Sequence, residues 1–311
     1  MRVLIALGGN AMTGPDGSAT QQAQQLAVEL AMKRVAELVG QGVEVVLTHG
    51  NGPQVGNLLV KNELAAHVVP PVSLDWCGAQ TQGTIGLLIL NALEHELAER
   101  GLRRRVVTVV SRTLVDAADP AFANPTKPVG RFLPAEEVAG YRDAGQHWVD
   151  FGAKGWRRVV PSPEPLEIMD APPARALMDA GYIVVAAGGG GVPVVRDQAG
   201  VLRGVEAVID KDLAAAILAP TLAADALVIA TDVDHVMTGY GTPRAAQVGE
   251  IGADALAELA DAGEFGAGSM GPKVTAAIRF VRRGGRFAVI TSLDRIADAV
   301  AGRYGTIVRA S

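Results

Sequence analysis

The chain of 311 residues is 49% hydrophobic, 20% charged and 4% aromatic, and it contains 37 glycines and 17 prolines. This composition excludes a disordered chain, a collagen-like repeat and a small disulfide scaffold, and the length suffices for one large α/β domain or two smaller ones. The formal net charge of −5 comes without a basic tail, so neither nucleic acid nor an anionic membrane is expected as a main partner.

Short β-branched runs alternate with longer Ala/Leu-rich segments, a pattern typical of parallel strands joined by crossover helices. In chain order we expect strands at 3–7, 43–48, 105–111, 182–187, 226–230 and 287–291, and helices at 21–39, 83–100, 211–218 and 268–283. From 117 to about 165 the alternation of strand-like and helix-like segments is lost, and Pro, Gly and aromatic residues are frequent. That segment predicts an inserted lid or subdomain.

The sequence favours a cytoplasmic protein. Cys77 is the single cysteine, so there is neither an intramolecular disulfide nor a CxxC zinc site, as suits a reducing compartment. The short apolar run at the N-terminus is interrupted at Gly8, and no uninterrupted apolar run reaches about 18 residues. We therefore expect neither a secretory signal nor a membrane span.

Two glycine loops follow predicted strands. Gly8-Gly9-Asn10 comes after the first strand, and His49 with Gly50-Asn51-Gly52 comes after the second. Glycine lets the backbone approach a ligand closely, and backbone N–H groups at such strand ends can bind an anion. Either loop alone could be an ordinary tight turn, but the pair favours a phosphate-bearing ligand. Neither loop has the dinucleotide-binding or P-loop spacing.

Lysine is rare in this chain, which has 22 Arg and 6 Lys. Three lysines occupy motif-like positions, namely Lys127 in NPTKP, Lys211 between Asp210 and Asp212, and Lys273 at a predicted helix start. A compact ammonium group suits a crowded phosphoryl-transfer site. Each lysine could instead be a solvated surface charge. The two aspartates could fix the ammonium groups or reach a magnesium ion, and Asp212 could also cap the following helix.

Taken together, the motifs resemble carbamate kinase, of the amino acid kinase superfamily. The matching segments are ALGGNA (6–11), HGNGPQVGN (49–57), NPTKPVG (124–130), GWRRVVPSPEP (155–165), GGGGVPVV (188–195), GVEAVIDKDLAA (204–215) and GSMGPK (268–273). Their order and spacing match over essentially the whole chain. The resemblance implies an α/β fold, an open and mainly parallel eight-stranded sheet between helices with a small protruding subdomain.

The same resemblance implies one domain over 1–311. Its N-terminal half, to about 180, would bind carbamate and the phosphoryl group and carry the lid at about 117–160; its C-terminal half, about 181–311, would bind the nucleotide. The implied reaction is reversible phosphoryl transfer between ATP and carbamate, giving ADP and carbamoyl phosphate, with Mg²⁺, and working to make ATP. A homodimer is also implied. The apolar stretch 83–93 could be interface or core, and we favour core.

By motif position, the resemblance also assigns roles to individual residues. The phosphoryl group and carbamate would contact Gly8, Gly9, Asn10, Gly50, Asn51 and Gly52. The catalytic residues would be Lys127, Lys211, Asp212 and Lys273. The nucleotide would contact Asp210, Lys211, Asp232, Tyr240, Met270 and Lys273, although Tyr240 could equally be a partly buried loop tyrosine. No protein metal ligand is expected, and His49 is interpreted as a structural strand-end histidine.

Two positions depart from related patterns. Other kinases of the superfamily carry a lysine before the first glycine pair, where this chain has Ala6. We hypothesise that Lys127, delivered by the lid, replaces that charge and that lid closure completes the site and excludes water. Arg131 stands where a proline is expected after the lid glycine, so the local shape of the lid stays open.

Two alternative functions are also compatible with the sequence. The nearest is another small-carboxylate kinase of the same superfamily, such as one acting on acetylglutamate; Ala6 and the NPTKP segment speak against it. The second is an inactive nucleotide-binding regulatory module, since a fold does not guarantee chemistry. The presence of Lys127, Lys211, Asp212 and Lys273 favours an active enzyme.

Overall fold

An eight-stranded sheet forms the centre of the computed structural model, which describes residues 1–14, 20–266 and 268–311. The strands, in spatial order, are β15 (Glu250–Gly252), β17 (Thr306–Arg309), β16 (Phe287–Ser292), β12 (Ala226–Thr231), β1 (Arg2–Leu7), β2 (Glu44–His49), β9 (Ile183–Val185) and β3 (Val106–Thr108). The six strands from β16 to β3 are parallel, and β17 with β15 runs the other way. The predicted α/β class and mainly parallel eight-stranded sheet are confirmed.

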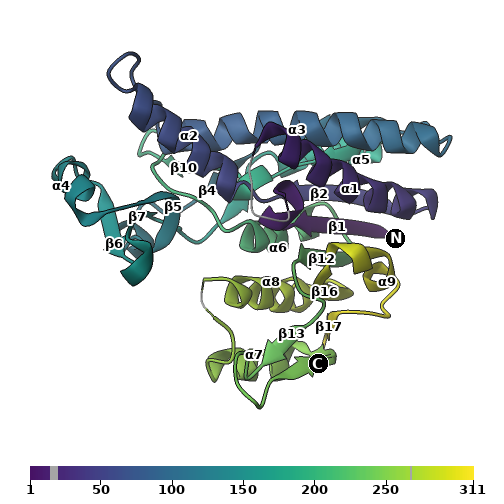
Figure 1. Cartoon of the computed structure of the whole chain (residues 1–311). Coiled ribbons are helices and arrows are strands. Elements are labelled where there is room, and N and C mark those ends of the chain that lie inside the picture. The colour runs from purple at the N-terminus through teal and green to yellow at the C-terminus, as the bar shows by residue number, and fades with distance from the viewer. Residues whose placement is uncertain (15–19, 267) are drawn as a thin grey trace.

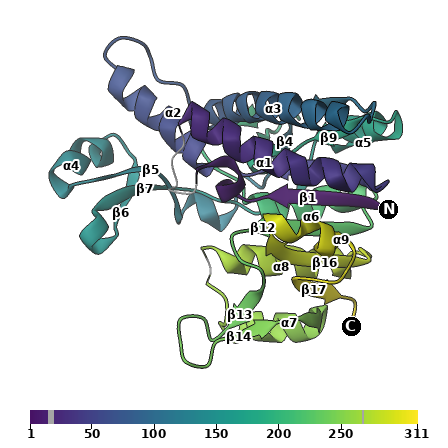
Figure 2. The same cartoon turned by 45° about the vertical axis from the view of Figure 1, so that its right-hand side comes forward.

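Helices cover both faces of this sheet (Figures 1 and 2). Along β1, Val3, Ile5 and Leu7 enter one hydrophobic core, while Leu4 and Ala6 enter the other. The first core includes residues of α1 (Gln21–Gly40), α3 (Leu74–Glu99) and α9 (Ile296–Val300), and the second includes residues of α5 (Ala171–Asp179), α6 (Lys211–Thr221), α7 (Ala253–Asp261) and α8 (Met270–Arg282). Because both faces are buried, the central strands read as continuous apolar runs.

Most predicted elements lie within a few residues of their expected positions, but two helices differ. Helix α3 begins nine residues before the expected start at 83, because its internal glycines obscure the apolar pattern. One of them, Gly86, is required there, since a Cβ would lie 2.6 Å from the Oγ1 of Thr108. Helix α2 (Gly52–Ala65) was not predicted, because the residues at its start, the N-cap Asn51 followed by Gly52 and Pro53, resemble a turn. In the stretch 83–93, Ile85, Ile89 and Leu93 are fully buried whereas Leu87 is 55% exposed, so one side of the helix lies in the core and the other at the surface.

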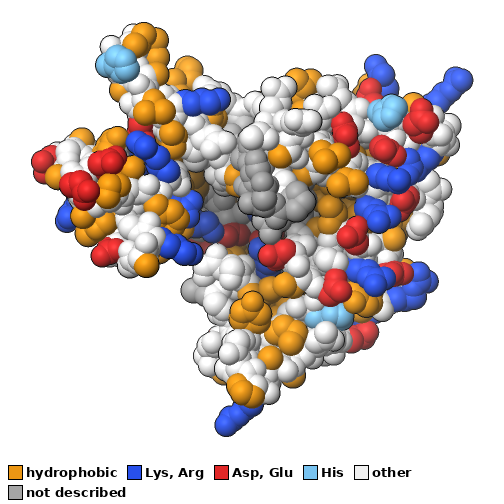
Figure 3. Space-filling model, viewed as in Figure 1, with side chains coloured by type: hydrophobic (Ala, Val, Ile, Leu, Met, Phe, Trp, Pro, Cys, Tyr) orange, Lys and Arg blue, Asp and Glu red, His pale blue; other side chains and the backbone are white. Residues whose placement is uncertain are grey.

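A small antiparallel sheet projects from the body between α3 and α5 in the sequence. It contains β5 (Lys127–Leu133), β7 (Trp156–Val160) and β6 (His147–Asp150), with α4 (Ala135–Asp143) packed on it. Figures 1 and 2 show this arm standing apart, and the surface is notched between the arm and the C-terminal half (Figure 3). We call residues 127–160 the protruding subdomain. The domain limits expected from the sequence remain a prediction.

Arg131 lies where the β5 strand is irregular. The pairing of β5 with β7 shifts register between Val129 and Phe132, and Gly130 has a φ of +69°. The Nε of Arg131 lies 3.4 Å from a carboxylate oxygen of Glu63 on α2. The arginine therefore ties the bulge of the protruding subdomain to α2, a contact that a proline could not make.

The remaining strands form two smaller sheets. They are β11 (Leu202–Gly204), β10 (Val192–Arg196), β4 (Arg112–Leu114) and β8 (Glu167–Ile168) in one, and β13 (Val236–Thr238) and β14 (Ala246–Val248) in the other. Four short 3-10 turns, η1 (Gly9–Met12), η2 (Pro120–Phe122), η3 (Gly152–Lys154) and η5 (Leu293–Arg295), lie outside the sheets, and a fifth, η4 (Gly188–Gly190), follows β9. Across the described ranges, every helix is too short or too polar to cross a bilayer.

Candidate active site

The two predicted glycine loops lie next to each other because β1 and β2 are parallel neighbours in register, with Leu7 opposite His49. The Gly50 N–H donates to the Leu7 carbonyl at 2.9 Å, and the Gly8 N–H donates to the Ala230 carbonyl of β12 at 2.9 Å. A Cβ at Gly50 would lie 3.2 Å from the backbone nitrogen of Gly9. A side chain at Gly50 would therefore press against the first loop.

The glycine-rich turn after β9 supports the second loop from behind. A Cβ at Gly188 would overlap the imidazole of His49, and one at Gly189, whose φ is +67°, would overlap the side chain of Asn51. Asn51 donates from its amide nitrogen to the Thr81 hydroxyl at 2.8 Å. The side chain of Asn51 is therefore held by α3 and the turn, and the backbone of the loop faces the first glycine loop.

The His49 side chain lies inside the protein, which supports its interpretation as a structural residue. The ring is buried and its Nδ1 lies 3.0 Å from the Gly50 carbonyl oxygen. Burial lowers the pKa of His49 to about 4, with the hydrogen bond to Gly50 acting against this and the nearby Lys211 charge adding to it. The imidazole is therefore neutral at pH 7, and the tautomer with a proton on Nδ1 donates to that carbonyl.

A buried carboxylate joins two of the predicted lysines. Asp212 lies in the first turn of α6, and its two oxygens accept from Lys211 Nζ at 2.5 Å and from Lys273 Nζ, on α8, at 3.1 Å. The Asp212 side chain is 3% exposed. Burial alone would raise the pKa of Asp212, but the charges and hydrogen bonds of the two lysines lower it below its usual value. The carboxylate is ionised and holds both ammonium groups.

The third predicted lysine reaches the same region from the protruding subdomain. Lys127, the first residue of β5, donates to an Asp210 oxygen at 3.1 Å. The other oxygen of Asp210 caps α6 by accepting from the backbone N–H of Asp212 at 2.9 Å and of Leu213 at 3.4 Å. Lys127, Lys211 and Lys273, from three separate parts of the chain, are thus interleaved with two aspartates at the N-terminus of α6.

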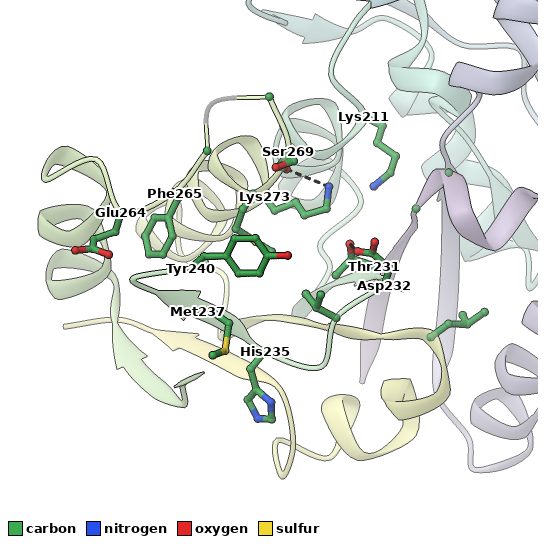
Figure 4. A pocket seen from close by; sticks show the side chains of 18 residues that line it. Lys211, Thr231, Asp232, His235, Met237, Tyr240, Glu264, Phe265, Ser269 and Lys273 are labelled. Atoms are coloured by element: carbon green, nitrogen blue, oxygen red, sulfur yellow. Dashed lines mark hydrogen bonds between the residues drawn. The ribbon is translucent and has the colours of Figure 1, made fainter. Parts of the chain in front are cut away.

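A cavity of about 600 Å³ opens beside this cluster. One end is formed by Gly8, Gly9, Lys211 and Lys273, and Figure 4 shows the two lysine side chains together at that end. The walls leading away from the lysines are largely apolar and include Val233, Met237, Phe265, Met270 and Leu293. A cavity with cations at one end and apolar walls elsewhere suits a ligand with an anionic tail and a flat apolar head.

Tyr240 stands over the middle of this cavity (Figure 4). It lies in a turn after β13 in which Gly239 has a φ of +56°, and the Gly239 N–H donates to the Glu264 carboxylate at 2.7 Å. The Thr242 hydroxyl closes the turn by donating to the Gly239 carbonyl at 2.7 Å. Tyr240 is 80% exposed, so the interpretation of it as a partly buried loop residue is wrong. The turn places the Tyr240 side chain at the open side of the cavity.

The cavity brings together seven residues predicted from the sequence: Gly8, Gly9, Lys211, Asp232, Tyr240, Met270 and Lys273. Gly52 lies elsewhere, at the mouth of a second hollow beside Arg131 and Arg157. The backbone of Asn10 is part of η1, and its side chain lies outside the described atoms. The roles assigned to these residues, including nucleotide contact by Asp210, stay predictions.

Sequence reasoning missed Glu264 and Phe265 of the cavity lining. Five further lining residues lie in segments that the resemblance assigned, 231–241 at the adenine and ribose site and the GSMGPK motif at 268–273, but were not named one by one: Thr231, Val233, His235, Met237 and Ser269. Glu264 and Phe265 follow α7 and carry no motif. Among the described residues, no three His, Cys, Asp or Glu side chains gather into a metal-binding group.

Comparison with known proteins agrees with this geometry. Residues 1–292 match the model of the amino acid kinase family. The chain is 47% identical to a carbamate kinase of Thermococcus kodakarensis and 45% identical to one of Pyrococcus horikoshii, covering 99% of this chain and 98% of each relative. A solved structure of carbamate kinase from Giardia lamblia bound to AMP-PNP superposes with a TM-score of 0.94 at 42% identity, covering 100% of this chain and 98% of that one. The chain belongs to the amino acid kinase family.

Proposed function

We propose that this chain is a carbamate kinase, a phosphotransferase that moves a phosphoryl group reversibly between ATP and carbamate and gives ADP and carbamoyl phosphate. Relatives named carbamate kinase that are 45–47% identical over nearly the full length support this activity. The observation in this structure that carries the proposal is the pair of ammonium groups held by one buried carboxylate beside the first glycine loop. That arrangement places fixed positive charge where the phosphoryl group would be transferred.

Phosphoryl transfer needs positioning and electrostatic stabilisation more than covalent chemistry from the protein. Lys211 and Lys273 would neutralise charge on the transferred phosphoryl group and on the phosphates of ADP, and Asp212 would orient both. The two glycine loops, at Gly8, Gly9, Asn10, Gly50, Asn51 and Gly52, would hold the phosphoryl group and carbamate. The N–H groups of Gly8 and Gly50 already donate to neighbouring strands, so these two glycines would serve by leaving room for close approach, and other backbone N–H groups of the loops would bind the anion. Lys127 would contribute from the protruding subdomain. No general base is required.

The nucleotide would occupy the 600 Å³ cavity with its phosphates toward the lysines and its base against the apolar walls. The similar carbamate kinase from Giardia lamblia was solved bound to AMP-PNP, in keeping with this assignment. Met270 and Tyr240 would contact the nucleotide on the open side, and Asp232 would contact it near the end of β12. Asp210, whose two oxygens are engaged by Lys127 and by the N-terminus of α6, is assigned no nucleotide contact in this proposal.

Magnesium would accompany the nucleotide. Mg²⁺ prefers oxygen ligands and usually keeps several waters while binding phosphates and one or two carboxylates. The lysines already engage both oxygens of Asp212, and the described residues form no group of three metal-ligating side chains. The side chains present therefore fit an ion bound mainly by phosphate oxygens. Asp232, in the wall of the cavity, lies within the same site. Such an ion would neutralise phosphate charge.

The proposal includes two statements about the protein's setting. We expect synthesis of ATP from ADP and carbamoyl phosphate in the cytoplasm, a reducing compartment that suits a chain with a single cysteine.

We also expect a homodimer, because the outer face of α3 leaves Trp76 63% exposed and Leu87 55% exposed. Light scattering combined with size-exclusion chromatography tests the assembly, and a Trp76→Glu variant that stays dimeric would exclude this face as the interface.

The activity is tested by measuring ATP formed from ADP and carbamoyl phosphate with Mg²⁺, in the unsubstituted chain and in Lys211→Ala. We expect activity that falls by about 10²–10³-fold in the variant, as for loss of a group that stabilises transition-state charge. Acetylglutamate with ATP serves as the competing acceptor. ADP binding without ATP formation from carbamoyl phosphate would overturn the proposal in favour of a related kinase or a nucleotide sensor.

A further inference from the structure

One short connecting segment joins the lysine cluster to the base of the protruding subdomain. Residues 205–210 run from β11 to the N-terminus of α6 and carry Asp210 directly before Lys211. Three alternate residues of this segment contact the subdomain or its stem. The Glu206 carboxylate pairs with Arg158 of β7 at 3.1 Å, the Val208 N–H donates to the Pro161 carbonyl at 3.0 Å, and the Asp210 carboxylate accepts from Lys127 of β5 at 3.1 Å.

The last of these contacts differs from the other two because it lies at the phosphoryl site. Lys127 pairs with Val160 in the β5–β7 ladder, so the position of its backbone follows that of the subdomain. Asp210 is fixed, since its other oxygen caps α6 and its side chain is 14% exposed. A hydrogen bond between ionised groups in such surroundings is stronger and more directional than one in water.

Asp210 therefore has two separable functions. Its Oδ1 accepts backbone N–H groups of α6, which an asparagine can also do. Its Oδ2 accepts from the Lys127 ammonium, and this contact depends on the negative charge of the carboxylate. Replacement by asparagine would preserve the helix cap and weaken the contact with the subdomain.

We infer that Asp210 is a positioning residue that docks the protruding subdomain onto α6 through Lys127 and presents this lysine to carbamoyl phosphate. The inference rests on the proposed function and deepens it. Lys127 would then reach the substrate from a held position, and the cost of ordering a long side chain would be met before binding. Without the Asp210 charge, the subdomain would remain attached by Arg158–Glu206 and Val208–Pro161, and Lys127 would lose its fixed place.

The kinetic test compares Asp210→Asn with the unsubstituted chain. We expect the KM for carbamoyl phosphate to rise about tenfold, as for the loss of a charge-assisted hydrogen bond, while the KM for ADP changes by less than about twofold. In a Lys127→Met background, Asp210→Asn should add nothing further, because the partner is absent. Equal effects of Asp210→Asn in the two backgrounds, or equal changes in both KM values, would overturn the inference.

A second readout needs no catalysis and separates failure of this inference from failure of the proposed function. In hydrogen exchange of the substrate-free protein, Asp210→Asn should speed exchange of amides in 127–133 by at least about threefold and leave those of α6 unchanged. The matched control is Asp197→Asn, because Asp197 also accepts backbone N–H groups and pairs with an arginine, Arg203, away from the site. Unchanged exchange in 127–133 would refute the docking role whatever the enzyme's substrate.

Discussion

Replacing Asp212 by asparagine removes the one buried carboxylate that holds both Lys211 and Lys273. With nitrogen–oxygen distances of 2.5 and 3.1 Å, Coulomb's law gives roughly 5–7 kcal/mol for each attraction at an effective dielectric constant of about 20. The cost of removing the carboxylate from water offsets most of this, so the net loss on breaking the buried pair should be about 3–5 kcal/mol. The asparagine would leave two ammonium groups side by side without an anion.

The loss of stability in Asp212→Asn can be measured, and an added anion should partly reverse it. At about 2 cal/mol/K of unfolding entropy per residue, it lowers the melting temperature by roughly 5–8 °C. Inorganic phosphate should raise the melting temperature of Asp212→Asn more than that of the unsubstituted chain, because the anion replaces the missing charge and ligand binding stabilises the folded state. Differential scanning calorimetry over a phosphate series, at constant ionic strength, measures both effects.

Asp170→Asn provides the matched control. Asp170 also pairs with a cation, Arg112, at 2.8 Å, and its pKa is also lowered: burial opposes the shift, and the hydrogen bonds and charge of Arg112 outweigh it. It does not line the 600 Å³ cavity, so its variant should show no extra response to phosphate. If Asp212→Asn melts within about 1 °C of the unsubstituted chain, or gains no more from phosphate than Asp170→Asn, the assignment of Asp212 as the shared counter-ion is refuted.

Three further predictions concern residues around the site. The pKa of His49 is about 4 in the folded protein against an ordinary 6.5, so on acidification the unfolded chain binds the proton first. The free energy of unfolding should therefore fall by about 3 kcal/mol between pH 6.5 and pH 4. In urea titrations, His49→Gln should lack this pH-dependent loss of stability. Cys77 is buried and burial raises the pKa of its thiol, so a thiol reagent at neutral pH should leave the native protein active; rapid loss of activity would contradict this. Gly188→Ala should cost about 1–3 kcal/mol, because its methyl group meets the His49 ring. In the same urea titration Gly140→Ala, on the open face of α4, should instead stabilise the protein by up to about 1 kcal/mol.

The sequence predicted the structural features that depend on residues close together in the chain. The β1 and β12 strands are buried on both faces and therefore read as apolar runs, and the glycine after β1 is required because a Cβ there would lie 2.8 Å from the Ala230 carbonyl. Asp210 precedes α6 and caps it, a local arrangement that propensity favours, although the sequence pointed to Asp212 as the cap. Long-range pairing could not be derived in this way. Lys127 and Asp210 are 83 residues apart in the chain, and only the resemblance suggested that Lys127 approaches the site.

The misjudged elements share a different cause. Helix α3 was shortened in the prediction because glycine lowers helix propensity, yet Gly86 is needed where the helix passes Thr108 of β3. Helix α2 was missed because Asn-Gly-Pro is a common turn, although proline is also favoured in the first turn of a helix. In both cases tertiary packing selects between two local conformations of the same residues, and no window of sequence contains the packing partner.

If the site acts as proposed, its arrangement of charge suits a phosphoryl group that must both bind and leave. Three ammonium groups close together without anions would repel one another and destabilise the fold, while complete pairing would leave no net charge for a substrate. The structure has Lys127, Lys211 and Lys273 against Asp210 and Asp212, a surplus of one positive charge. A phosphoryl group brings further negative charge and can take over ammonium hydrogen bonds from the aspartates. Binding then exchanges one set of charge-assisted hydrogen bonds for another with the lysines already in place, so little reorganisation is needed during transfer.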